Sequence, residues 1–267
     1  MTTGTGSTER VLQILDLFSE TRLEWTADEL METLGYSRPT LYRYIKSLKE
    51  LGFLTQNGPH GLTLGPRFVE LDFLMRKSDT LLREGEPLLR TMAQAHPCTA
   101  LLVRWYGNKM LCVASEVSAP NPKSSYPRGR PMPLARGAIS RAILAYLPRR
   151  QMLKKIEENL PELSNLGLGL TVEQIAESLR QMRKGGAMIA HGEVTEGVVG
   201  IAAPVFDDSR APVAVLCMTI DRTTLNETII ADLSAFVSNS AETLSAALAV
   251  KRTDEGTPGA LQSTSTA

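Results

Sequence analysis

The chain has 267 residues, of which 43% are apolar and 22% charged, enough for two globular domains of ordinary size. Lysine plus arginine and aspartate plus glutamate number 29 each, which excludes a uniformly basic nucleic-acid-binding protein. No apolar run approaches the length of a membrane span and the first residues lack the features of a signal peptide, so we expect a cytoplasmic protein without membrane contact.

The first part of the chain predicts two short helices. Apolar residues at i, i+3, i+4 and i+7 from Val11 to Phe18 predict an amphipathic helix over residues 10–19. The sequence Thr-Ala-Asp-Glu at 26–29 is a capping box, which predicts a second helix that ends at Gly35.

Residues 37–54 predict a third helix with a cationic outer face. Ser37 is a suitable N-cap, Pro39 fits the first turn and Gly52 provides a stop. One side is apolar and the other polar or basic. The apolar side carries Leu41, Ile45, Leu48 and Leu51, and the opposite side carries Arg38, Thr40, Arg43, Lys46 and Lys49. Two short apolar segments around a Gly/Asn/Pro loop at 56–61 follow and predict a β-hairpin.

Helix, short turn, cationic helix and hairpin are the order of a winged helix-turn-helix, whose second helix enters the DNA major groove. Residues 35–67 carry five cations and one acid, a local balance of 5 − 1 = +4, so the remainder sums to −4. We expect Arg38, Thr40 and Arg43 to meet base edges, and Tyr42, Lys46 and a wing residue to meet phosphates, although these roles are exchangeable among neighbours. The candidate DNA-binding residues are Ser37, Arg38, Thr40, Tyr42, Arg43, Lys46, Asn57 and His60. The alternatives are a solvated basic surface helix and, for Tyr44, a core position.

The rest of the chain predicts an α+β domain with an antiparallel sheet. Residues 66–83 predict a linking helix whose apolar stripe suits burial against a second copy, so we expect a homo-oligomer. Further helices are expected at 86–95, at 136–147, from the capping box at 171 to Gly185, and after a capping box at 224–227. Strands are expected at 99–105, 109–115, 187–191, 199–206 and 213–220, with a loop at 120–133.

Three separated blocks, at 37–65, 128–148 and 197–207, resemble the IclR family of bacterial transcription regulators. The resemblance covers about residues 8–250. It implies a winged helix-turn-helix at 7–65, a linker helix at 66–83 and a GAF-like α/β effector domain at 84–250, and we expect a disordered tail at 251–267. It also implies a dimer, or a dimer of dimers, on a roughly palindromic double-stranded DNA operator.

The same resemblance implies a pocket for a small-molecule effector. The implied effector-binding residues are Arg128, Gly129, Arg130, Met132, Leu134, Ala135, Gly200, Cys217 and Thr219. Arg128 and Arg130 at the entrance favour a small organic acid, aromatic acids included, because a guanidinium holds a carboxylate bidentately. The alternative is that both arginines only solvate the loop. Ala190 and Gly200 stand where some family members carry an acid and a cysteine, which leaves room for a bulkier ligand.

Signals of catalysis are absent from the sequence. It contains no GxSxG, HExxH or Walker motif and no GxGxxG after a strand. Cys98, Cys112 and Cys217 are an odd number, lie far apart and lack metal-ligand spacing, so they indicate neither a disulfide framework nor a zinc site, and they fit a reducing cytoplasm. We therefore expect no enzymatic activity, metal or cofactor. The rival interpretation is a cytoplasmic sensor or enzyme whose winged helix contacts protein.

Overall fold

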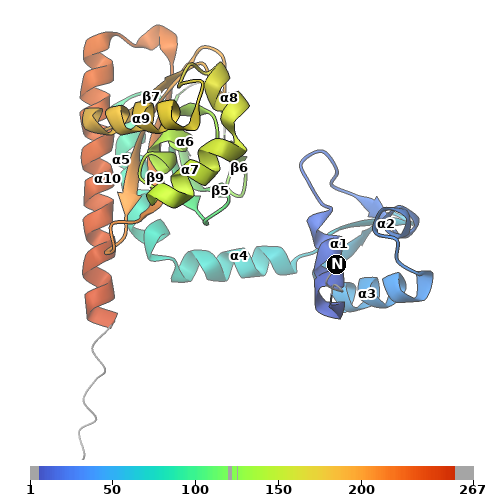
Figure 1. Ribbon diagram of the computed structural model, residues 1–267. Coiled ribbons are helices and arrows are strands. Elements are labelled where there is room, and N and C mark those ends of the chain that lie inside the picture. The colour runs from blue at the N-terminus through green and yellow to red at the C-terminus, as the bar shows by residue number, and fades with distance from the viewer. Residues whose placement is uncertain (1–5, 120–121, 125, 256–267) are drawn as a thin grey trace, which may run out of the picture. The chain divides into compact units, whose positions relative to one another are not determined.

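The computed structural model describes residues 6–119, 122–124 and 126–255 (Figure 1). The chain forms two compact units, and the boundary between them lies between Asp79 and Thr80. Each unit has its own hydrophobic core.

The first unit is a winged helix-turn-helix, as the sequence predicts. Its elements are α1 Ser7–Asp16, β1 Trp25–Thr26, α2 Ala27–Leu34, α3 Arg38–Glu50, β2 Leu54–Asn57, β3 Gly61–Leu64 and α4 Arg67–Ser78. The three strands form an antiparallel sheet in the order β1-β3-β2, and β2 and β3 form the wing. The short strand β1 was not predicted, and α1 begins three residues earlier than expected.

The predicted capping box at the start of α2 is confirmed. The Thr26 hydroxyl accepts the Glu29 backbone N–H at 3.3 Å, and the Glu29 carboxylate accepts the Thr26 backbone N–H at 2.8 Å. These bonds hold the pKa of the Glu29 carboxyl below its usual range, chiefly because of the donating Thr26 backbone N–H. Gly35 ends the helix in the left-handed region at φ 66°, which a residue without a Cβ adopts freely.

Helix α3 packs on the core through Leu41, Tyr44, Ile45 and Leu48, so Tyr44 is a core residue. Leu51, predicted on the same apolar side, is 63% exposed, because it lies beyond the last helical residue where the helical periodicity no longer holds.

Helix α4 is shorter than the predicted linking helix at 66–83. It ends at Ser78, and Asp79 is extended at φ −85° and ψ 107°. The Ser78 hydroxyl donates to the carbonyls of Leu74 and Met75 at 3.2 Å each, which competes with the backbone ladder at the end of the helix. A separate helix, α5 Thr80–Ala95, then includes the segment expected at 86–95.

The second unit is an α+β domain built on one antiparallel sheet, as predicted. Its strands are β4 Thr99–Trp105, β5 Met110–Val117, β6 Pro131–Met132, β7 Met188–His191, β8 Val198–Phe206 and β9 Pro212–Asp221, in the order β6-β5-β4-β9-β8-β7. Its further helices are α6 Gly137–Leu144, α7 Arg149–Glu158, α8 Leu160–Asn165, α9 Val172–Met182 and α10 Glu227–Glu255.

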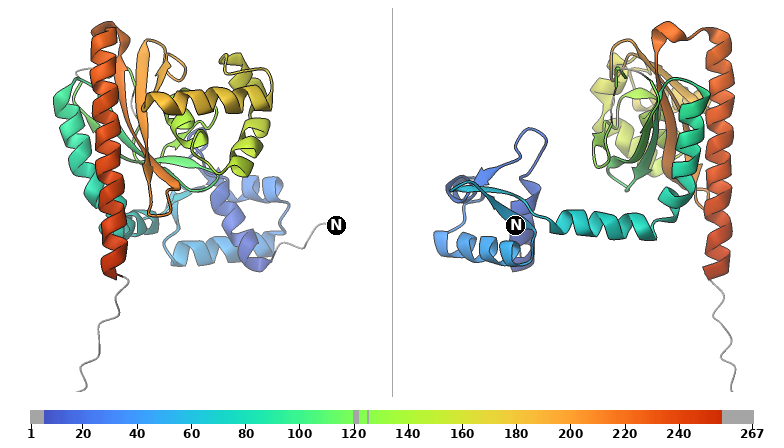
Figure 2. Two further views of the ribbon diagram at one scale, coloured as in Figure 1. Left: turned by 60° about the vertical axis from the view of Figure 1, so that its left-hand side comes forward. Right: turned by 180° about the vertical axis from the view of Figure 1, so that it is seen from behind.

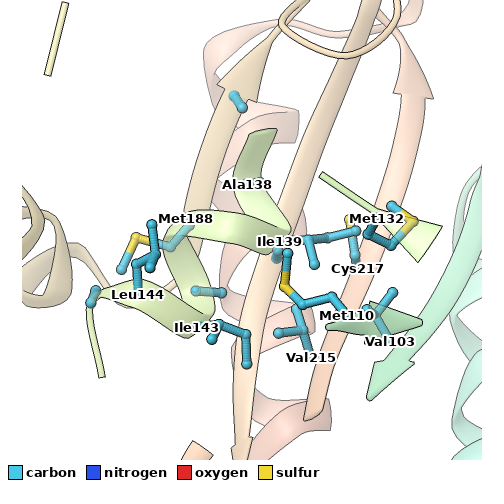
Figure 3. Packing of buried hydrophobic residues seen from close by; sticks show 14 of the residues in the cluster. Val103, Met110, Met132, Ala138, Ile139, Ile143, Leu144, Met188, Val215 and Cys217 are labelled. Carbon is cyan, nitrogen blue, oxygen red and sulfur yellow. The ribbon is translucent and has the colours of Figure 1, made fainter. Parts of the chain in front are cut away.

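Helices cover both faces of this sheet (Figure 2). One face packs on α5 and α10, and the opposite face packs on α6. The alternation along β9 shows why: Leu216 and Met218 point toward the α5 and α10 side, whereas Val215 and Cys217 point toward α6. Figure 3 shows Val215 and Cys217 packed with residues of α6. Because both faces are buried, β8 and β9 are almost continuously apolar.

Several details differ from the sequence-based expectation. Helices α7 and α8 were not predicted, and the short strand β6 lies inside the expected loop at 120–133, of which residues 120, 121 and 125 lie outside the described residues. Asn226, not Thr224, caps α10, because its side chain accepts the Ile229 backbone N–H at 2.8 Å. Helix α10 continues to Glu255, so the expected tail does not begin at 251; residues 256–267 lie outside the described part of the chain.

Candidate DNA-binding face and effector cavity

The outer face of α3 is a cationic surface on a rigid element. Arg38, Arg43, Lys46 and Lys49 are exposed, and the opposite side of the helix is buried in the core. Because the apolar side anchors the helix in the core, the basic side chains stay in solvent and none of their charges has to be buried. Such a surface attracts the phosphates of a nucleic acid.

Neighbouring side chains orient these cations. The Arg38 guanidinium lies 5.5 Å from the centre of the Tyr42 ring, and the Arg43 guanidinium lies 5.4 Å from that of Tyr44. Lys46 is 3.8 Å from the Glu50 carboxylate in an exposed i,i+4 pair. Exposed pairs of this kind are weak, so a phosphate can replace the carboxylate.

A groove of about 680 Å³ separates α3 from the wing. Tyr42 and Lys46 line it from α3, and His60 lines it from the wing. Lys49 spans the groove by donating to the Gln56 side-chain oxygen at 2.9 Å. The structure therefore brings Tyr42, Lys46 and His60 to one groove.

The other candidate residues lie around this groove. The Asn57 amide donates to the Glu24 carboxylate at 2.7 Å, and Asn57 does not line the groove. Ser37 occupies the N-cap position of α3, but its hydroxyl donates to the Thr40 hydroxyl at 2.9 Å and not to a backbone group. Both hydroxyls thus lie at the exposed start of α3.

The second unit contains a cavity of about 40 Å³ between the start of α6, the strands β8 and β9, and the loop that joins β7 to β8. Residues that line it are Ser124, Tyr126, Met132, Pro133, Arg136, Gly137, Ala138, Ile139, Ala190, Glu193, Val194, Thr195, Val198, Gly200, Cys217 and Thr219. Most of the lining is apolar or small, with a few polar groups, as in binding sites for small organic molecules. Figure 3 shows Ile139 of α6 and Cys217 of β9 side by side in this region.

Four of the residues expected at the effector site line this cavity: Met132, Gly200, Cys217 and Thr219. The other five do not. The Arg128 guanidinium donates to the Val113 carbonyl, and the Arg130 guanidinium lies 5.1 Å from the centre of the Tyr126 ring. Gly129, Leu134 and Ala135 are likewise outside the lining.

The polar groups at the cavity come from other residues, which sequence reasoning missed. The Glu193 carboxylate accepts the Gly137 backbone N–H at 2.9 Å and pairs with the Arg141 guanidinium. The side chains of Arg141 and Glu193 are 8% and 13% exposed. Arg136 lines the cavity and pairs with Glu162. No sequence motif links Glu193 to Arg141, because 52 residues separate them.

Hydroxyl groups and one thiol complete the wall. Ser124 donates to the Thr219 hydroxyl at 2.9 Å, and Thr219 donates to the Thr99 carbonyl at 3.3 Å. Burial raises the pKa of Cys217, so this thiol is neutral at physiological pH. Within the described part of the chain no cluster of His, Cys, Asp or Glu side chains is suited to hold a metal ion.

Comparisons with known proteins agree for both units. A family model described as "Bacterial transcriptional regulator IclR C-terminal" matches residues 75–246, and one described as "IclR helix-turn-helix domain" matches residues 7–58. The chain is 24% identical to the transcriptional regulator KipR of Bacillus subtilis over 74% of this chain and 79% of that protein. It is 25% identical to the regulator KdgR of Escherichia coli over 89% of this chain and 90% of that protein.

Solved structures share the fold. An IclR transcriptional regulator from Alicyclobacillus acidocaldarius superimposes with a TM-score of 0.72 at 20% identity, covering 90% of this chain and 98% of that one. IclR of Thermotoga maritima superimposes with a TM-score of 0.66 at 18% identity, covering 91% and 98%. None of the helices in the described ranges combines the length and the apolar character needed to cross a bilayer.

Proposed function

Because the chain belongs to the IclR family of bacterial transcription regulators, we propose that a small organic acid, bound in the cavity of the second unit, controls its hold on a DNA operator. The chain is a DNA-binding transcription regulator and not an enzyme. The observation that carries the proposal about the effector is the cavity at the start of α6, where the first turn of that helix and Glu193, the partner of the buried Arg141, border an apolar pocket.

On the DNA side, Arg38, Thr40 and Arg43 read base edges in the major groove. Arg43 is the principal candidate because it is exposed in the first half of α3, the part of a recognition helix that enters the groove. Arginine pairs bidentately with the acceptors of guanine. Such a contact is worth about 1–3 kcal/mol of discrimination.

Phosphate contacts come from the groove between α3 and the wing. Tyr42, Lys46 and His60 line it and can contact a sugar-phosphate backbone, whereas the acidic residues of its lining, Asp28 and Glu50, cannot. Asn57 is the weaker of the two wing candidates, because its amide is already bound to the Glu24 carboxylate. Ser37 supports this face through its bond to Thr40.

On the effector side, the positive end of α6 favours an anion. Gly137, Ala138 and Ile139 form the first turn of α6 and line the cavity. Backbone N–H groups of a first helical turn, together with the helix dipole, bind carboxylates. The apolar walls from Met132 and Ala190 accommodate a hydrocarbon portion, so the effector class is a small monocarboxylic acid, aromatic acids included. We therefore assign carboxylate binding to the first turn of α6 and not to Arg128 and Arg130, which lie outside the cavity lining.

A homodimer, or a dimer of dimers, is the working form. The first unit exposes large apolar side chains along α4: Val69 is 73% exposed, Phe73 64%, and Leu74 and Met75 53% each. No residue of α4 is buried. Val69 and Phe73 are four residues apart and therefore lie on one side of the helix, and a second copy of α4 would cover this exposed apolar side.

The test combines operator binding with an effector screen. Fluorescence anisotropy measures the affinity for a labelled operator fragment with and without a panel of small aliphatic and aromatic acids, each paired with its amide. At least one acid, and not its amide, should change the operator affinity of the wild type. If no acid has an effect, or if each amide acts equally, the proposed effector class is wrong.

A cavity-filling variant localises the site. A Cβ at Gly200 would lie 3.5 Å from the Ala138 Cβ, an ordinary contact, so Gly200→Ala should fold and respond nearly as the wild type does. Gly200→Val adds two further methyl groups into the cavity and should abolish the response to the acid while operator binding persists. A full response of Gly200→Val would remove this cavity from the effector site.

A further inference from the structure

We infer that Glu193 is an internal competitor for the effector: its carboxylate occupies the place that the effector's carboxylate takes, and binding requires that Glu193 leave it. This inference rests on the proposed function, because it assumes an acidic effector in the cavity. It makes Glu193 a specificity-determining residue of that site.

The geometry is that of a carboxylate-binding site with a resident carboxylate. One Glu193 oxygen accepts the Gly137 backbone N–H at 2.9 Å at the start of α6. The other accepts from Nη2 of Arg141, one turn further along the same helix. Nη1 of Arg141 donates to the Ile189 carbonyl at 2.9 Å, and the Arg141 Nε is buried without a partner. Helix end and guanidinium therefore converge on a single anion.

The Arg141 charge makes this site depend on an anion being present. Its side chain is 8% exposed, and removing one partner of a buried ion pair leaves an uncompensated charge, which is strongly destabilising. A neutral molecule that displaced Glu193 would leave the buried Arg141 charge without a compensating negative charge. A carboxylate effector would not, because it replaces one negative charge with another while Glu193 moves into water. The exchange therefore selects acids over their amides.

The loop that carries Glu193 forms one wall of the cavity. Glu193, Val194 and Thr195 line it, and Val194 is 43% exposed. Glycines with left-handed backbones flank the loop, Gly192 at φ 66° and Gly197 at φ 73°. The cavity of about 40 Å³ is smaller than an aromatic acid needs, so removal of the Glu193 side chain also supplies room.

The size of the effect follows from the population of the open loop. A minor state is commonly populated at about 0.1–10%. The apparent affinity of a ligand that binds only this state equals its intrinsic affinity multiplied by the populated fraction. An internal competitor of this kind weakens carboxylate binding by about 10- to 1,000-fold. Removing it should tighten binding by at least about tenfold.

The experiment uses acetate, which replaces the carboxymethyl group that Glu193→Ala removes. Isothermal titration and thermal unfolding are measured with sodium acetate, with acetamide, and with sodium chloride at equal ionic strength. Glu193→Ala should bind acetate at least about tenfold more tightly than the wild type and be stabilised saturably by it, whereas acetamide and chloride should not stabilise it. Glu196→Ala, an exposed acid in the same loop, should behave as the wild type.

Equal acetate affinity in Glu193→Ala and wild type, or equal stabilisation by acetamide, overturns the inference. If Glu193→Ala does not fold even with acetate, Glu193→Gln is the deciding variant. Gln retains the shape of the side chain and an acceptor for the Gly137 N–H but lacks the charge, so this variant should still bind acetate more tightly than the wild type. An unchanged acetate affinity of Glu193→Gln overturns the inference. Failure of the proposed function has a different outcome, in which acetate fills the vacated site but no acid changes operator affinity in any variant.

Discussion

Replacing Lys46 by Gln tests whether the groove beside α3 holds DNA phosphates. Lys46 is exposed on α3 and lines the groove, and its partner in the protein is the Glu50 carboxylate at 3.8 Å. Each phosphate contact that is lost reduces the slope of log affinity against log salt by about 0.9. The proposed dimer carries two copies of the residue, so the slope should become shallower by about 1.8.

The assay is fluorescence anisotropy on a labelled operator over a series of potassium chloride concentrations. The affinity for unrelated DNA should fall in parallel with that for the operator, because a phosphate contact carries no sequence information. An exposed pair of this type stabilises the fold by less than about 1 kcal/mol, so the variant should unfold close to the wild type.

The matched control is Lys154→Gln. Lys154 lies on α7 of the second unit and pairs with Glu158 at 3.9 Å, also at i,i+4 and also exposed. It removes the same charge and the same kind of ion pair, so the salt slope should equal that of the wild type. An unchanged slope in Lys46→Gln, or an equal change in Lys154→Gln, would refute the assignment of Lys46. A wild-type operator affinity that does not depend on salt would exclude phosphate contacts as its source.

Four further outcomes are expected. Arg43→Ala should weaken operator binding by about 5- to 150-fold at fixed salt, with less effect on unrelated DNA; an equal loss on both would make Arg43 a phosphate contact. Phe73→Glu places a charge on the exposed face of α4 and should yield monomers in analytical ultracentrifugation, and an unchanged mass would exclude that face from the interface. The Glu29 carboxyl has a lowered pKa in the folded protein, so its contribution to stability is present above its unfolded pKa and is lost as the pH falls through its folded pKa. The melting temperature of Glu29→Gln should therefore fall less than that of the wild type between about pH 6 and about pH 3, and equal decreases would contradict this. Burial raises the pKa of Cys112 to about 11, so native protein at about pH 8 should react with a disulfide reagent far more slowly than urea-unfolded protein.

Local chemistry explains the elements that were predicted correctly. The capping box of Thr26 and Glu29 closes within four residues, and the turn at Gly35 needs only the freedom of glycine at φ 66°. The wing and the strands of the larger sheet follow from short apolar segments separated by turn residues. Such signals depend on neighbours in the chain, so a single sequence is sufficient to recognise them.

The errors in the predicted secondary structure lie at the ends of helices. Leu51 continues an apolar period but falls beyond the end of α3, and Asn226 outcompetes Thr224 as the cap of α10. The linking helix was predicted as one piece, because its apolar pattern continues past Asp79, where the backbone is extended. Pattern alone does not report where a helix stops.

Short sequence signals were sufficient to predict an N-terminal winged helix-turn-helix with a cationic helix and an antiparallel sheet after it, because periodicity, caps and turns are encoded over a few residues. Which side chains meet at the cavity depends instead on how the second unit folds. Arg128 and Arg130 lie outside its lining, whereas Glu193 reaches the start of α6 from a loop 56 residues away from Gly137. Contacts of that kind arise from the folding of the sheet, which brings distant segments together and which no short motif encodes.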